Sequence, residues 1–277
     1  MRRPPSLNRA KKRFGQHFLH DPGTIERILR AIGPRPGDRL VEIGPGRGAI
    51  TVPLLEATGA LDVIEIDRDV VPELERRCGG RGELRVHLAD ALEFDFRALR
   101  GTGPRLRLVG NLPYNVSTPL LFHFLGQLDA VADMHFMLQK EVVTRMAAPP
   151  GGKEYGRLTV MLAPWVRVER LFDIGTGAFS PPPGVVSTFF ALHPHDRPPF
   201  EIGDERAYAR VVAAAFAQRR KTLRNSLAGL LTGPQIAAAG IDAGARPETL
   251  SPAQFAALAR QLASQGGCDW SSGGGDL

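Results

Sequence analysis

The feature that most constrains the fold is a buried strand that runs directly into a glycine-rich turn. Residues 39–43 form a short apolar run, and Gly44, Gly46 and Gly48 follow at alternate positions. Residues 49–57 then have the pattern of a helix. Strand, glycine turn and helix in this order are typical of nucleotide-binding α/β folds, because glycines let a ligand approach the backbone. The G-x-G-x-G spacing differs from the dinucleotide fingerprint, so the motif alone does not identify the ligand.

The same alternation continues along the first 146 residues. Runs at 61–66, 84–91, 106–109 and 134–139 predict further strands, and 24–32, 70–77 and 140–146 predict helices, as does the apolar segment after Pro119. Alternating strands and helices favour a parallel sheet with helices on its faces. Runs at 159–163, 166–172 and 188–192 predict strands that extend this sheet. We therefore predict an α/β fold of the Rossmann type.

The chain changes character near residues 193–197, which contain Pro and His and indicate a linker. Residues 205–231 have a helical pattern, and 234–239 and 252–262 predict two more helices. The C-terminal residues are rich in Gly and Ser. We therefore predict a basic arm over 1–13, an α/β domain over 14–195, a small all-helical domain over 196–265 and a disordered tail over 266–277.

Composition narrows the classes of partner. The net charge of +6 and the pI near 9.8 favour a polyanionic partner. The excess of Arg over Lys fits phosphate recognition or, equally, a GC-rich genome. The chain lacks an apolar run approaching the roughly 20 residues that span a bilayer, and the basic start leads into no apolar signal segment. Cys78 and Cys268 have no metal-binding spacing, which favours free thiols in a reducing cytoplasm.

Three polar residues lie at the ends of different early strands or directly after them. Glu65 ends the second strand and lies 19 residues after Gly46, the interval at which a carboxylate binds a ribose hydroxyl. Asp90 lies at the end of the third strand, and Asn111 follows the fourth. Because parallel strands end at one edge of a sheet, we expect these side chains to gather around one cleft. Taken singly, each has a plainer interpretation: Glu65 as a solvated loop acid, Asp90 as a helix N-cap, and Asn111 as part of a turn.

The combination indicates a cofactor beside a reacting amine. A nicotinamide cofactor would suit the glycine turn and Glu65, but a second glycine fingerprint and an acid–base pair for hydride chemistry are missing from the sequence. S-adenosylmethionine suits all four elements, with backbone amides at the glycines, Glu65 for the ribose and Asp90 for the adenine amino group. Asn111 then faces the substrate.

Several motifs together resemble the ribosomal RNA adenine N6,N6-dimethyltransferases over residues 11–262. They are Phe14–Leu19, Val41–Gly46, Glu65–Asp67, Gly110–Tyr114, Phe179–Pro183 and Gln218–Arg224. The helical C-terminal segment and the run Arg219–Arg224 resemble the bacterial small-subunit branch. That branch dimethylates two adjacent adenosines in the 3′-terminal hairpin of 16S rRNA during 30S ribosome biogenesis, and its loss is linked to kasugamycin resistance.

The resemblance implies roles for particular residues. The catalytic set comprises Asn111, Leu112, Pro113, Tyr114 and Phe179. The set that binds S-adenosylmethionine comprises His17, Leu19, Gly44, Gly46, Glu65, Ile66, Asp90, Ala91 and Asn111. The predicted RNA-binding cations are Lys11, Lys12, Arg13, Arg219, Arg220, Lys221 and Arg224. The resemblance also implies a cytoplasmic monomer that modifies rRNA and requires neither a metal nor a membrane.

One position departs from the family pattern. The family usually has Asn in Gln-Asn-Phe-Leu, where this chain has His17. Imidazole can also donate or accept a hydrogen bond, so we expect cofactor binding to survive with a different contact.

Two other functions fit the same motifs. One is the related large-subunit rRNA dimethyltransferase that confers macrolide resistance. The other is a noncatalytic RNA-binding assembly or transcription factor on the same fold, against which the intact Asn-Leu-Pro-Tyr and carboxylate set argues.

Overall fold

The computed structural model describes residues 17–218 and 220–265, which divide into two compact units. Unit 1 comprises the chain up to Val143 together with Val168–Pro194, and unit 2 comprises Thr144–Arg167 and the chain from His195 onward. The predicted linker, residues 193–197, contains one of the points at which the chain passes from unit 1 to unit 2, between Pro194 and His195. Residues 144–167, which the sequence analysis placed in the α/β domain, group with the C-terminal helices.

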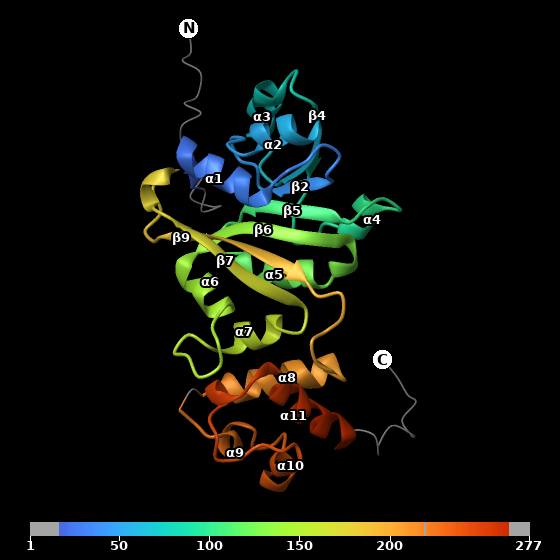
Figure 1. Cartoon of the computed structure of the whole chain (residues 1–277), viewed down its shortest axis with the longest axis vertical. Helices are drawn as coiled ribbons and strands as arrows, with labels where there is room; N and C mark the ends of the chain where they lie inside the picture. Colours follow the sequence, from blue (N-terminus) through green and yellow to red (C-terminus); the bar gives the residue numbers. More distant parts are fainter. Residues whose placement is uncertain (1–16, 219, 266–277) are drawn as a thin grey trace. The chain divides into compact units, whose positions relative to one another are not determined.

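Unit 1 is built on a seven-stranded sheet with the strand order β4-β3-β2-β5-β6-β9-β7 (Figure 1). The first five strands in this order pair in parallel, and β9 pairs with β6 antiparallel. The strands are β2 (Leu40–Ile43), β3 (Ala60–Glu65), β4 (Glu83–Leu88), β5 (Leu106–Asn111), β6 (Val131–Gln139), β7 (Val166–Ile174) and β9 (Ser187–Pro194). The predicted α/β fold with a mostly parallel sheet is confirmed.

Helices follow the strands of unit 1, as parallel pairing requires. They are α1 (Pro22–Ile32), α2 (Thr51–Thr58), α3 (Val71–Cys78), α4 (Phe96–Arg100), α5 (Ser117–Leu125) and α6 (Lys140–Met146), with single turns η2 (Leu128–Ala130) and η3 (Thr176–Ala178). The last of these helices, α6, crosses from unit 1 into unit 2 after Val143. In α1 the Asp21 carboxylate accepts the Thr24 N–H at 2.7 Å, which caps the first turn. Ile28 and Ile32 of α1 are buried in the core of the unit together with Leu40.

A second, two-stranded sheet joins distant parts of the chain. β1 (Phe18–Leu19) pairs antiparallel with β8 (Phe179–Ser180), with Leu19 opposite Phe179. The sequence analysis predicted neither strand. Two residues are too few to show the alternating pattern of a strand, so only the tertiary structure reveals this pairing.

Unit 2 is helical. It contains α7 (Arg157–Leu162), α8 (Glu205–Phe216), α9 (Leu223–Ser226), α10 (Gly233–Ala238), η4 (Pro247–Thr249) and α11 (Pro252–Gln265). Helices α8 and α11 lie side by side and share a core with residues of α7 (Figure 1). The Tyr155 hydroxyl donates to the Leu250 carbonyl at 2.7 Å, and the Tyr208 hydroxyl donates to the Val160 carbonyl at 2.9 Å. These contacts explain why residues 144–167 belong to unit 2.

Two predictions of secondary structure were wrong. Residues 159–163 were predicted as a strand, but α7 covers most of them, and Thr159 Oγ1 accepts the Gly156 N–H at 3.3 Å before the first turn. A short apolar run reads equally well as a buried strand or a buried helix, which accounts for the error. The helical pattern over 205–231 is interrupted after Phe216 and resumes at Leu223.

Candidate active site

A cavity of about 360 Å³ lies where β2, β3, β4 and β5 end. Parallel strands bring their carboxyl ends to this edge, so the turns that follow them form the walls. All nine residues predicted to bind the cofactor line the cavity, as do Leu112, Pro113 and Tyr114. The sequence therefore predicted which residues gather here, although their individual roles stay predictions.

The glycine turn and Glu65 form one hydrogen-bonded wall. The Gly46 N–H donates to Glu65 Oε2 at 3.3 Å, and the Asp67 N–H donates to Glu65 Oε1 at 2.8 Å. Gly46 has φ +54°, and a Cβ there would lie 3.2 Å from the Phe18 ring, so the close packing favours glycine. Burial raises the pKa of Glu65, which is 4% exposed. Glu65 is therefore not a solvated loop acid.

Glu42 is a wall residue for which the sequence analysis proposed no role. It is 2% exposed, and its Oε2 atom has no hydrogen-bond partner among the described residues. Burial raises the pKa of Glu42 to about 8; the Thr51 hydroxyl opposes this shift, and the nearby charge of Glu65 adds to it. A carboxyl group in an otherwise apolar strand, Leu40–Ile43, was the signal that could have found it.

Asp90, Ala91 and Ile66 form the wall beyond β3 and β4. Asp90 Oδ1 accepts the Leu92 N–H at 2.9 Å, an interaction within a turn rather than at the start of a helix. The helix N-cap interpretation is therefore wrong, and Asp90 remains available to the cavity. Ile66 is 51% exposed, so it offers the cavity an apolar surface.

Four of the five predicted catalytic residues lie at the end of β5 and in the loop that follows it. The Asn111 side-chain amide donates from Nδ2 to the His17 carbonyl at 3.1 Å, which leaves its oxygen as an acceptor. The Leu112 N–H donates to the Met137 carbonyl at 3.3 Å, and the Leu112 side chain is buried. The Val116 N–H donates to the Pro113 carbonyl at 3.2 Å. The segment is thus a turn, as its composition suggested, and at the same time a wall of the cavity.

Tyr114 contacts two residues that lie far from it in the sequence of unit 1, one on each side. Its hydroxyl lies 2.7 Å from Ser187 Oγ at the start of β9, and its ring centre lies 5.9 Å from that of His17. Burial raises the pKa of Tyr114, while the hydrogen bond to Ser187 acts in the opposite direction. The phenol is therefore protonated at neutral pH and offers a flat apolar face.

Phe179 does not line the cavity. It is 2% exposed, lies in β8 and packs into the core of unit 1. The resemblance placed Phe179 in the catalytic set together with Tyr114. That role stays a prediction, and it requires the ring to leave its present packing.

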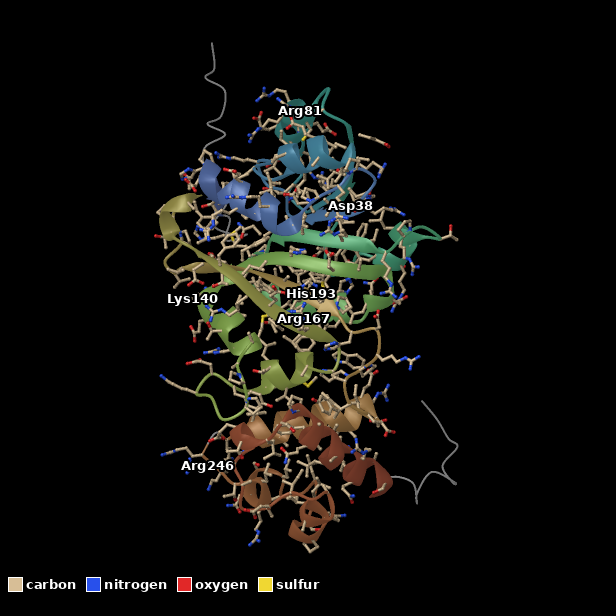
Figure 2. All side chains as sticks on the ribbon, viewed as in Figure 1. Asp38, Arg81, Lys140, Arg167, His193 and Arg246 are labelled. Carbon is tan, nitrogen blue, oxygen red and sulfur yellow. The ribbon has the colours of Figure 1, made fainter. Side chains whose placement is uncertain are left out.

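Three of the predicted RNA-binding cations belong to the part of the chain that the structure describes, and these three do not line the cavity. Lys11, Lys12, Arg13 and Arg219 lie outside the described residues. Arg220, Lys221 and Arg224 belong to unit 2, where all three are exposed. Arg246 of the same unit is exposed as well and extends from the ribbon in Figure 2.

Within residues 17–218 and 220–265, no group of three or more His, Cys, Asp or Glu side chains is arranged to hold a metal ion. Of the helices that the structure describes, none has the length and apolar character needed to cross a bilayer.

Comparison with known structures supports the fold. A dimethyladenosine transferase from Plasmodium falciparum superposes with a TM-score of 0.75 at 24% identity, over 90% of this chain and 98% of the other. A 23S rRNA methyltransferase, ErmE, superposes with a TM-score of 0.70 at 24% identity, over 89% and 99% of the two chains. At this identity the likeness concerns the fold alone.

Sequence comparison extends the likeness. A ribosomal RNA small subunit methyltransferase A from Nitrosococcus oceani is 57% identical over 91% of this chain and 96% of its own length. A protein of the same name from Pseudomonas putida is 55% identical over 93% and 97% of the two chains. The model of the family described as ribosomal RNA adenine dimethylase matches residues 7–264. The chain therefore belongs to the ribosomal RNA adenine dimethylase family.

Proposed function

We propose that this protein transfers methyl groups from S-adenosylmethionine to N6 of two adjacent adenosines in the 3′-terminal hairpin of 16S rRNA. The observation that carries the proposal is the fixed Asn111 amide, which lies in one cavity with the glycine turn and the carboxyl groups of Glu42, Glu65 and Asp90. The relatives named small subunit methyltransferase A support the choice of 16S rRNA. We further propose that it acts as a cytoplasmic monomer on the pre-30S subunit.

The cavity suits S-adenosylmethionine in size and chemistry. About 360 Å³ falls in the range of small-molecule sites, roughly 300–1,000 Å³. Glu65 would accept from the ribose hydroxyls and Asp90 from the adenine amino group, beside the apolar surface of Ile66. When bound, the cofactor supplies an electrophilic methyl group on a sulfonium sulfur.

The end of β5 and the loop that follows it, Asn111–Asn115, form what we call the acceptor loop. This loop compensates for the weak nucleophilicity of adenine N6. The N6 lone pair is delocalised into the purine ring, so the amine must be pulled toward tetrahedral geometry before it can attack. The Asn111 side-chain oxygen and the Leu112 carbonyl would accept the two N6–H groups and aim the lone pair. Pro113 restricts the loop, and such positioning can lower a barrier by several kcal/mol. The face of Tyr114 would stack on the extruded base, a contact worth roughly 1–3 kcal/mol.

A substrate test separates the candidate functions. The purified protein is incubated with tritiated S-adenosylmethionine and with unmethylated small or large ribosomal subunits in turn. We expect label in 16S rRNA only. Label in large-subunit RNA would indicate the macrolide-resistance type of enzyme. Binding of RNA without any transfer would indicate an assembly or transcription factor.

Removing the Asn111 side chain tests the proposed catalytic role. We expect Asn111→Ala to reduce the rate of methyl transfer by about 100- to 1,000-fold, which is the loss typical of removing a hydrogen bond that stabilises the transition state. Cofactor affinity, measured by calorimetry, should weaken only in part because the rest of the wall remains. Thr118 is exposed in the first turn of α5, directly after this loop, and does not line the cavity, so Thr118→Ala is a control that should keep most of the activity. Equal activity of wild type and Asn111→Ala would refute the role.

A further inference from the structure

His17 stands where the family pattern usually has asparagine. The hydrogen bond and the ring contact of its side chain are with Pro181 and Tyr114, neither of which belongs to the predicted cofactor-binding set. Its contacts reach instead toward the loop that carries the acceptor residues. The main-chain carbonyl of His17 accepts the Asn111 amide at 3.1 Å. This contact uses only the backbone, so it does not depend on which side chain stands at position 17.

The imidazole makes two contacts of its own. Nδ1 lies 2.8 Å from the Pro181 carbonyl oxygen. Because a carbonyl can only accept, Nδ1 must carry a hydrogen. The ring centre lies 5.9 Å from that of Tyr114 with 30° between the planes, within the range of attractive aromatic pairs. The side chain of His17 thus links the Pro181 loop to the Tyr114 ring.

Tyr114 is fixed at its other end as well. Its hydroxyl forms a hydrogen bond with Ser187 Oγ, and Ser187 is fully buried. A ring that is held both at its hydroxyl and along its side has few orientations open to it. The surface on which the adenosine stacks is therefore set before RNA arrives, which lowers the entropic cost of binding.

We propose that His17 is a positioning residue for the acceptor adenosine, whose imidazole fixes the Tyr114 ring and the Pro181 loop and adds little to cofactor affinity. The inference rests on the proposed function. It also assigns a purpose to the departure from the family pattern. Asparagine carries an amide nitrogen on Cγ, as histidine carries Nδ1, so it can keep the bond to Pro181. It has no ring to place beside Tyr114.

Three variants separate the two contacts. His17→Asn keeps a donor but loses the ring, His17→Phe keeps a ring but loses the donor, and His17→Ala loses both. His20 is exposed in the same segment, so His20→Ala controls for the loss of an imidazole there. Circular dichroism and thermal melting establish that each variant folds.

Steady-state methyl transfer is measured at saturating cofactor with the concentration of unmethylated small subunits varied, and cofactor affinity is measured separately by calorimetry. We expect His17→Asn and His17→Phe each to lower kcat/KM for the subunit by about 5-fold, and His17→Ala by about 25-fold, because one hydrogen bond and one aromatic pair are each worth about 1 kcal/mol. The cofactor dissociation constant should stay unchanged, and His20→Ala should behave as wild type.

Two kinetic outcomes would overturn the proposal. If the cofactor dissociation constant rises while the subunit parameters stay constant, His17 is a cofactor ligand. If all variants match wild type, the contacts have no functional effect. Nitrogen-15 NMR of the histidines provides a readout that does not need activity: we expect the hydrogen of His17 on Nδ1, and a hydrogen on Nε2 alone would also overturn the proposal. A wild-type protein that fails to methylate small subunits would refute the proposed function while leaving this NMR test intact.

Discussion

At the scale of single residues, Glu42 combines deep burial with a carboxyl group. Its pKa of about 8 means that the free protein holds a proton on Glu42 at neutral pH, whereas the unfolded chain, with the ordinary value of 4.5, does not. Between these two values the native state binds more protons, so stability falls as the pH rises. The contribution is complete below about pH 4.5 and is lost as the pH rises through about 8.

Replacing this carboxyl by an amide should remove that pH dependence. We expect the free energy of unfolding of wild type, relative to Glu42→Gln, to fall by up to about 1.4 kcal/mol per pH unit between pH 5 and 8, and to level off above. Urea denaturation of both proteins across pH 5–9 measures the difference. A constant difference over this range would show that Glu42 titrates normally.

At the scale of elements, the close approach of β2 and β5 brings the cofactor turn to the acceptor loop. Gly110 pairs with Ile43 in the sheet, and a Cβ at Gly110 would lie 2.5 Å from the Ile43 carbonyl oxygen. The obstacle is backbone, which cannot move aside as a side chain could. Glycine at this position therefore allows Asn111 and the Gly44–Gly48 turn to face the same cavity.

We expect Gly110→Ala to force the two strands apart. The free energy of unfolding should fall by roughly 1–3 kcal/mol, as for other substitutions that overfill a packed interior, and methyl transfer should fall because Asn111 is displaced. Urea denaturation and the tritium assay measure the two effects. Gly175 has φ −66° and open space around it, so Gly175→Ala should leave both quantities unchanged. Unaltered stability of Gly110→Ala would contradict the steric argument.

The elements also show what the sequence could predict. The strands of the sheet are apolar runs, and parallel pairing then places Glu65, Asp90 and Asn111 at one edge without further information. β1 and β8 escaped prediction because each has two residues and their pairing joins positions far apart in the chain. The bond from His17 to Pro181 spans 164 residues and leaves no local pattern. Phe179 belonged to a recognisable motif, but only the packed core shows that its ring is buried.

At the scale of the whole molecule, the net charge of +6 is consistent with a polyanionic substrate. Unit 2 contributes exposed cations at Arg220, Lys221 and Arg224, close together in the sequence. Because phosphate contacts release counterions, affinity that depends on such residues weakens as the salt concentration rises.

Reversal of these three charges to glutamate should weaken RNA binding and flatten its salt dependence. We expect the negative slope of log K against log salt to become shallower by about 0.7–0.9 for each phosphate contact that is lost. Filter binding to small-subunit RNA at several salt concentrations gives the slope. Arg206 and Arg210 are exposed on α8 of the same unit, and their reversal serves as the control with a smaller effect. An unchanged slope for the triple variant would exclude phosphate contacts at these positions.

The two-segment composition of unit 2 has a consequence for protein engineering. Tyr155 and Val160 come from the first segment, yet they are buried with Tyr208 and Phe255 of the second. A single cut after Pro194 would separate the C-terminal helices from Tyr155 and Val160. The apolar side chains that pack against these two residues would then be exposed to water. A chimera that borrows these helices from a relative must therefore transplant residues 144–167 along with them, as a matched pair of inserts.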